Sequence, residues 1–116
     1  MLCNSHFSLS YSGDWLKYHV YFGSLGQTNA LEIFYSKSTT GGLLEVWLDS
    51  RSSSSGRKVG EFAPQYTGSR WRYYKSETIE LADDIEGWHD VYMVVSGANG
   101  LANLDWFQFK YQAPVV

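Results

Sequence analysis

The chain has 116 residues and a formal net charge of −3, from nine Lys and Arg against twelve Asp and Glu. Its length predicts a single domain, residues 1–116, which is large enough to bury its own core. The net negative charge argues against nucleic-acid binding, which needs a basic face. No apolar run approaches the roughly 18 residues of a membrane helix.

Alternating side chains predict short β-strands along most of the chain, because residues two positions apart share one face of a strand. From Trp15 onward, for example, Leu16 and Tyr18 fall on one side while Lys17 and His19 fall on the other. Glycine- and serine-rich connectors separate these segments, and no convincing helix is present. About eight antiparallel strands, packed as a sandwich or barrel, are therefore expected. The predicted strands are 15–22, 30–35, 43–49, 58–62, 71–74, 77–81, 88–95 and 103–110.

Aromatic residues make up 17% of the chain and include five Trp and nine Tyr. Their rings offer rigid apolar faces with few torsions to freeze, which suits ligands with a flat side and polar edges, such as sugars and nucleobases. Trp47 shares its strand face with Glu45, which predicts exposure, whereas the parity of Trp106 with Leu104 predicts a core position. Trp88, at the start of a strand, is expected to cap the core.

The sequence contains none of the common catalytic motifs, such as the nucleophile elbow, the phosphate-binding loop or the zinc-binding helix. His6, His19 and His89 are too scattered to indicate a metal site, and the lone Cys3 is expected near a frayed terminus. Glycoside hydrolysis needs only two carboxylates about 5 to 10 Å apart, so a small glycosidase or lyase stays open as an alternative. We expect no catalysis, since any acidic sandwich offers such pairs by chance. The candidate carboxylates are Glu32, Glu45, Asp49, Glu61 and Asp105.

Five short segments carry a shared pattern: GDWLKY at 13–18, GGLLEVWLDS at 41–50, TGSRW at 67–71, GWHDVY at 87–92 and NLDWFQF at 103–109. In this order and spacing the chain resembles the family 6 carbohydrate-binding modules over residues 13–109. The resemblance implies a jelly-roll β-sandwich that binds polysaccharides of the β-glucan or xylan type without cleaving them. It also implies an extracellular protein that is joined to a glycoside hydrolase in a longer chain.

The resemblance implies a first sugar site at the loops on one edge of the sandwich. There Trp71 corresponds to an aromatic residue that grips a sugar ring, and Asn103 to an asparagine that binds the hydroxyl groups. The family's second aromatic residue falls on Leu9 in this sequence, so Tyr11 (or Phe7) would have to replace it.

A second implied sugar site is a cleft on the concave face of one sheet. Trp15 corresponds to its aromatic residue, and Lys17 shares the same side of the strand. Glu45 is the expected carboxylate, Trp47 shares its face, and Lys110 is expected at the far edge. These residue types suit sugars, because rings stack on indoles and carboxylates accept hydrogen bonds from hydroxyl groups.

The N-terminal segment is shorter than in the family, whose extra strand and loop supply ligands for a structural Ca²⁺. Asp105 corresponds to one calcium carboxylate, but its partners have no counterpart in the sequence. The missing strand predicts a sheet edge that is covered either by residues 1–12 or by a second copy in a homodimer. No signal peptide is visible at the start. The alternative function is a structural or assembly jelly roll that has lost its sugar site.

Overall fold

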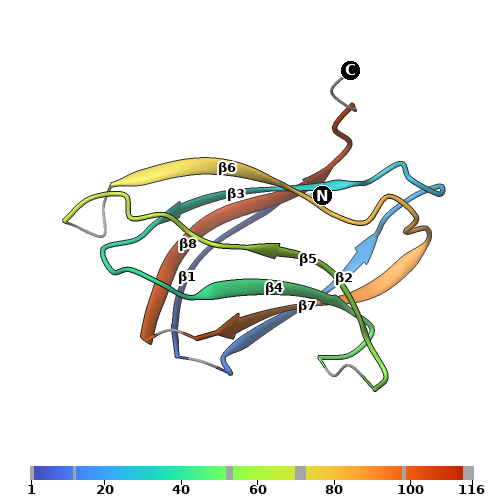
Figure 1. The fold of residues 1–116 in the computed structure, drawn as a ribbon. Coiled ribbons are helices and arrows are strands. Elements are labelled where there is room, and N and C mark those ends of the chain that lie inside the picture. The colour runs from blue at the N-terminus through green and yellow to red at the C-terminus, as the bar shows by residue number, and fades with distance from the viewer. Residues whose placement is uncertain (1, 12, 52–53, 70–72, 98, 114–116) are drawn as a thin grey trace.

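The computed structural model describes residues 2–11, 13–51, 54–69, 73–97 and 99–113, which form two antiparallel sheets (Figure 1). The strands are β1 (Leu2–Tyr11), β2 (Trp15–Tyr21), β3 (Ala30–Ser36), β4 (Leu43–Leu48), β5 (Arg57–Phe62), β6 (Tyr74–Glu80), β7 (Trp88–Ser96) and β8 (Asn99–Lys110). Sheet A has the order β1-β8-β3-β6, and sheet B the order β2-β7-β4-β5. No helix of the described residues is long and apolar enough to cross a membrane.

Strands that are neighbours in a sheet are mostly far apart in the sequence, because the chain passes repeatedly from one sheet to the other. The first strand pairs with the last, with Leu2 opposite Gln108 and Leu9 opposite Ala102. In sheet B, β7 lies between β2 and β4 (Figure 1). These pairings confirm the predicted all-β fold, a jelly-roll β-sandwich of antiparallel strands.

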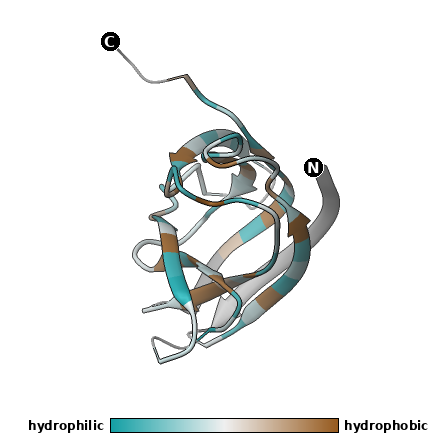
Figure 2. Ribbon diagram, turned by 90° about the vertical axis from the view of Figure 1, so that its right-hand side faces the viewer, coloured by the Kyte–Doolittle hydropathy of each residue, from teal (hydrophilic) through white to brown (hydrophobic). Residues whose placement is uncertain are grey.

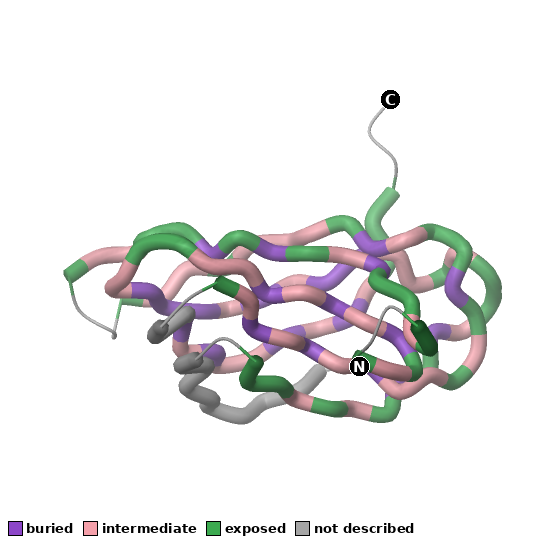
Figure 3. Tube along the Cα trace, turned by 60° about the horizontal axis from the view of Figure 1, so that its bottom comes forward, coloured by how far each residue is buried: buried purple, intermediate pink, exposed green. Residues whose placement is uncertain are grey.

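Apolar side chains from alternating positions fill the space between the two sheets. Figure 2 shows hydrophobic and hydrophilic residues alternating along the strands, and Figure 3 shows the matching alternation of burial. On β7, Val91, Met93 and Val95 are buried while the residues between them are partly exposed. Burying such a side chain is worth about 1.5–3 kcal/mol, so a slip of one residue would be costly and the register is fixed.

The N-terminal segment forms a strand that the sequence pattern did not predict. β1 pairs with β8, and Cys3 lies opposite Phe107 rather than in a frayed terminus. The register shifts between Asn4 and Phe7 and again between Leu9 and Tyr11, which breaks the regular alternation that identifies a strand. Residues 2–11 therefore cover the edge of β8, which is the first of the two expected alternatives, and β1 becomes the edge strand.

One strand replaces the two that were predicted at 71–74 and 77–81. β6 pairs without interruption with β3, from Tyr74 opposite Ser36 to Glu80 opposite Ala30. Its polar centre reads as a break in the sequence, but polar residues are tolerated there because β6 is the edge strand of sheet A. Residues 70–72 lie outside the described residues.

Trp106 lies on the outer face of sheet A, not in the core as predicted. Trp106 is paired with Phe34 while Leu104 is paired with Tyr35, so Asp105 is an extra residue in β8. This β-bulge reverses the parity, and the two side chains point to opposite faces. The indole stacks on Phe34 with the ring centroids 5.5 Å apart and the planes 16° from parallel.

Candidate functional site

The outward side chains of β2, β7 and β4 form one continuous surface, which we call the sheet B face. It contains the four residues that the sequence predicts for the sheet cleft: Trp15, Lys17, Glu45 and Trp47. Tyr92, on the strand between them, lies opposite both Lys17 and Trp47. The structure thus brings these side chains together from three strands that are distant in the sequence.

The indole of Trp15 is the exposed aromatic surface at one end of this face, with 44% of the residue accessible to solvent. Tyr92 flanks it, with the ring centroids 5.8 Å apart and the planes tilted by 53°. The Arg51 guanidinium lies over the indole, with Cζ 4.2 Å from the ring centroid. A flat ligand that stacks on the covered side of Trp15 must therefore displace Arg51.

Glu45 fixes the neighbouring side chains of the sheet B face. Its Oε1 accepts a hydrogen bond from Trp47 Nε1 at 2.9 Å, and its Oε2 lies 3.8 Å from Lys58 Nζ. Lys58 also pairs with Glu61 at 2.7 Å, and the hydrogen bond to Glu61 and the charges of both carboxylates raise its pKa. Lys58 thus joins Glu45 and Glu61 in one group of ion pairs.

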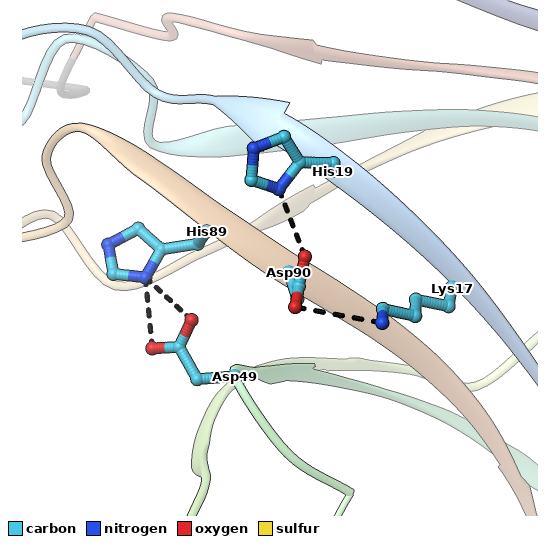
Figure 4. A network of polar contacts seen from close by, with 5 residues as sticks. All are labelled: Lys17, His19, Asp49, His89 and Asp90. Carbon is cyan, nitrogen blue, oxygen red and sulfur yellow. Dashed lines mark hydrogen bonds and ion pairs between the residues drawn. The ribbon is translucent and has the colours of Figure 1, made fainter.

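A polar network follows Trp15 along the sheet B face (Figure 4). Asp90 lies at its centre, 3.0 Å from His19 Nδ1 through Oδ1 and 3.7 Å from Lys17 Nζ through Oδ2. The hydrogen bond from His19, together with the charge of Lys17, lowers the pKa of Asp90. The Lys17 ammonium also lies 5.7 Å from the ring centroid of Tyr92. The network holds these side chains in place and keeps the centre of the face polar.

A second pair, His89 and Asp49, lies beside this network (Figure 4). His89 Nδ1 is 3.0 Å from Asp49 Oδ2, and His89 Nε2 is 2.9 Å from the carbonyl oxygen of Glu86. Both ring nitrogens of His89 thus face oxygen atoms that can accept hydrogen bonds. Asp49 has a φ of 68°, and its N–H donates to the Asp90 carbonyl at 2.7 Å. These contacts fix the turn that leads from β4 to Arg51.

Of the residues predicted for the loop site, only Asn103 is described with its side chain, and it belongs to the other sheet. Asn103 is a partly exposed residue of β8 in sheet A, opposite Ser36 on one side and Ser8 on the other. Tyr11 ends β1, and only its backbone is described. Trp71 lies outside the described residues. The loop site therefore stays a prediction.

Two further predicted residues of β8 also belong to sheet A. Lys110 was predicted at the far edge of the sheet cleft, but it does not line the sheet B face. It lies opposite Ala30, and its Nζ is 3.4 Å from Glu32 Oε1. Asp105 is the extra residue of the β-bulge in the same strand. Within the ranges that the structure describes, no three His, Cys, Asp or Glu side chains are grouped as metal ligands. The structural Ca²⁺ that the resemblance implies stays a prediction.

Sequence reasoning missed several residues of the sheet B face. Trp88 is 62% exposed, so its predicted place as a cap on the core is wrong. It shares the outward parity of Asp90 and Tyr92 on β7, a signal that the sequence did contain. Arg51 follows β4 in a loop, where no periodicity could place it over Trp15.

Known proteins resemble the chain over most of its length. The profile of the family "Carbohydrate binding module (family 6)" matches residues 4–111. A family 43 arabinoxylan arabinofuranohydrolase from Bacillus subtilis, in complex with cellotetraose, is 27% identical with a TM-score of 0.78; the match covers 94% of this chain and 22% of that one. A family 6 carbohydrate-binding module from Clostridium cellulolyticum, in complex with xylose, is 28% identical with a TM-score of 0.73, covering 92% and 88%.

A β-1,3-glucan binding module from Bacillus halodurans is 25% identical with a TM-score of 0.73, and the match covers 95% of this chain and 84% of that one. A search of curated proteins finds no match. The chain spans about a fifth of the arabinofuranohydrolase and most of the two smaller proteins.

Proposed function

The chain belongs to the family 6 carbohydrate-binding modules, which bind carbohydrates without cleaving them, and we propose that it holds a polysaccharide of the β-glucan or xylan type on the sheet B face. The observation that carries this proposal is the exposed indole of Trp15 beside Tyr92 and a row of polar side chains. The ligand class is supported by the similar structures, which contain cellotetraose or xylose or are described as binding β-1,3-glucan.

Stacking on Trp15 supplies the apolar part of this recognition. The axial hydrogens of a pyranose form an apolar patch that fits against an indole. Stacking of a planar ligand on an aromatic ring is worth about 1–3 kcal/mol, and we expect sugars in the lower part of that range. Tyr92 limits the movement of the indole, so little side-chain freedom is lost when the ligand binds.

The carboxylates of the sheet B face supply the polar part. An ionised carboxylate can accept about four hydrogen bonds. Glu45 uses one acceptor position for Trp47, and its other oxygen is 3.8 Å from Lys58, so positions remain for sugar hydroxyls. A shallow, wet surface loses much of its gain to ordering, and we expect dissociation constants in the micromolar to millimolar range, about −8 to −4 kcal/mol.

A second candidate location is the loop site, which Asn103 favours because its amide can both donate and accept hydrogen bonds at a partly exposed position. We also expect the module to be joined to a glycoside hydrolase and to work outside the cell. The similarity to part of the Bacillus subtilis arabinofuranohydrolase supports the first of these expectations.

Affinity gel electrophoresis in soluble xylan and β-glucan tests the proposal. We expect at least one of the two glycans to retard the wild-type protein. Trp15→Ala should reduce the affinity for that glycan about tenfold, and Asn103→Ala should leave the affinity unchanged. Retardation that survives Trp15→Ala and is lost in Asn103→Ala would move the site to the loops. If no glycan retards the wild-type protein, the result would favour the alternative function, a structural or assembly domain.

A further inference from the structure

Two more aromatic rings lie exposed at the end of the sheet B face that is distant from Trp15. Trp88 is 62% exposed and Tyr21 is 58% exposed. They are directly opposite each other on β7 and β2, with the ring centroids 5.1 Å apart. Adjacent large aromatic side chains left in solvent are uncommon unless a ligand or partner uses them. Neither ring contributes to the core.

The neighbouring residues hold Trp88 in a defined orientation. The imidazole of His19 stacks on the indole with the ring centroids 4.9 Å apart and the planes 9° from parallel. His19 is itself held by Asp90, whose Oδ1 lies 3.0 Å from Nδ1 (Figure 4). The indole is thus supported by a tethered ring while more than half of its surface remains in solvent. A ring held in this way loses little conformational freedom when a ligand stacks on it.

The two aromatic ends of the face are separated by a distance that fits an extended glycan. Trp15 and Tyr21 both point outward from β2. Six residues of strand at 3.2–3.4 Å per residue put them about 20 Å apart, which is several pyranose rings. Lys17 and Asp90 lie along this path and present a hydrogen-bond donor and acceptors to it (Figure 4).

We propose that Trp88 and Tyr21 form a second stacking platform for the same glycan chain that rests on Trp15. The sheet B face then recognises a run of several sugar residues within a long, extended polysaccharide rather than a single ring. This inference rests on the proposed function. A glycan fits the patch because the aromatic rings continue the surface of Trp15 in one direction and polar side chains connect them.

The dependence of affinity on ligand length tests this proposal. Isothermal titration calorimetry would compare a trisaccharide with the matching hexasaccharide, either xylo- or β-gluco-oligosaccharides according to the polysaccharide that binds. Longer ligands also gain because they can bind in more registers, and this statistical gain is the same in every variant. We therefore expect Trp88→Ala to lower the hexasaccharide-to-trisaccharide affinity ratio about tenfold, which corresponds to about 1.4 kcal/mol. The affinity for the trisaccharide should be unchanged.

Tyr21→Ala should lower the ratio in the same direction, and Tyr111→Ala serves as the matched control. Tyr111 is 59% exposed but follows β8 of sheet A, so its loss should leave the ratio unchanged. Sedimentation equilibrium of the same proteins tests the alternative occupant, a second copy of the chain.

A ratio that Trp88→Ala leaves unchanged, while the trisaccharide still binds, would overturn the second platform and leave the proposed function intact. A mass above that of one chain, which returns to one chain in Trp88→Ala, would assign the patch to self-association and would also overturn it. If the wild-type protein binds neither oligosaccharide, the proposed function fails and the second platform fails with it.

Discussion

The guanidinium of Arg51 competes with a stacking sugar for the surface of Trp15. Its Cζ lies 4.2 Å from the centroid of the indole, and the indole is the aromatic surface on which we place the ligand. A neutral glycan gives Arg51 no charge to pair with, so it must displace the cation without compensation. Replacing Arg51 by Gln removes the competitor and should strengthen the binding of neutral glycans.

The size of this effect follows from the contact that is lost. A cation–π interaction at an exposed site is worth about 0.5–1 kcal/mol. Removing it from the free protein therefore lowers the dissociation constant by about two- to fivefold. Arg51→Lys keeps the charge but not the planar group, and we expect an affinity between those of the wild type and of Arg51→Gln.

Isothermal titration calorimetry with a neutral oligosaccharide measures the change, and Arg57→Gln is the control. The Arg57 side chain is also exposed but pairs with Asp84 instead of covering a ring, so its removal should leave the affinity unchanged. Weaker binding by Arg51→Gln would refute the reasoning, because it would mean that the guanidinium contacts the sugar. An unchanged affinity would mean that the ligand does not use the covered side of Trp15.

Three further predictions concern stability and ionisation. Burial raises the pKa of Tyr35 to about 12 from its ordinary 10. The raised pKa adds about 3 kcal/mol to the free energy of unfolding, and this part should be fully present below pH 10 and lost between pH 10 and 12. Chemical denaturation across this range should show the loss in the wild type and a smaller loss in Tyr35→Phe. Gly26→Ala should cost about 1–3 kcal/mol in chemical denaturation, because φ is +74° and the added Cβ would lie 2.9 Å from the Asp83 carbonyl oxygen; an unchanged midpoint would contradict this. The Asp90 carboxyl should titrate below its ordinary pKa in an NMR experiment. His19→Ala should raise this pKa, since the hydrogen bond from His19 is the main cause of the shift. The stability that the Asp90 carboxylate contributes is present above its ordinary pKa and is lost as the pH falls through the lowered pKa.

The faces of β2 and β4 could be predicted from the sequence, because both strands alternate without interruption. The buried Val20 and the exposed Lys17 fix the parity of β2, and Trp15 follows from that parity. On β4 the buried Val46 separates Glu45 from Trp47 and turns both outward. In these strands the hydrophobic effect acts on each residue locally, so a period of two is sufficient information.

The assignment of side chains to a strand face from their alternation was wrong where a β-bulge adds a residue. The extra Asp105 in β8 turns Trp106 to the outer face although it is two positions from the buried Leu104. The shifts in β1 likewise hid a strand that includes Cys3. A bulge depends on the partner strand, and the pairing of β1 with β8 joins opposite ends of the chain.

The neighbours of Trp15 depend on strand order, which the sequence of one strand does not contain. Tyr92 reaches Trp15 only because β7 lies between β2 and β4. The same order separates Lys110 from the sheet B face, since β8 belongs to sheet A. Arg51 reaches the indole through a loop whose path is set by backbone and side-chain contacts of Asp49.

The central claim is that the sheet B face binds the glycan, and NMR mapping tests it most directly. Isotope-labelled protein would be titrated with a xylo- or β-gluco-oligosaccharide while the amide and indole signals are followed. We predict that the Trp15 and Trp47 indole signals and the amides of β2, β4 and β7 shift with one dissociation constant, while those of β8 around Asn103 do not. Shifts confined to Asn103 and its neighbours in sheet A would contradict the account.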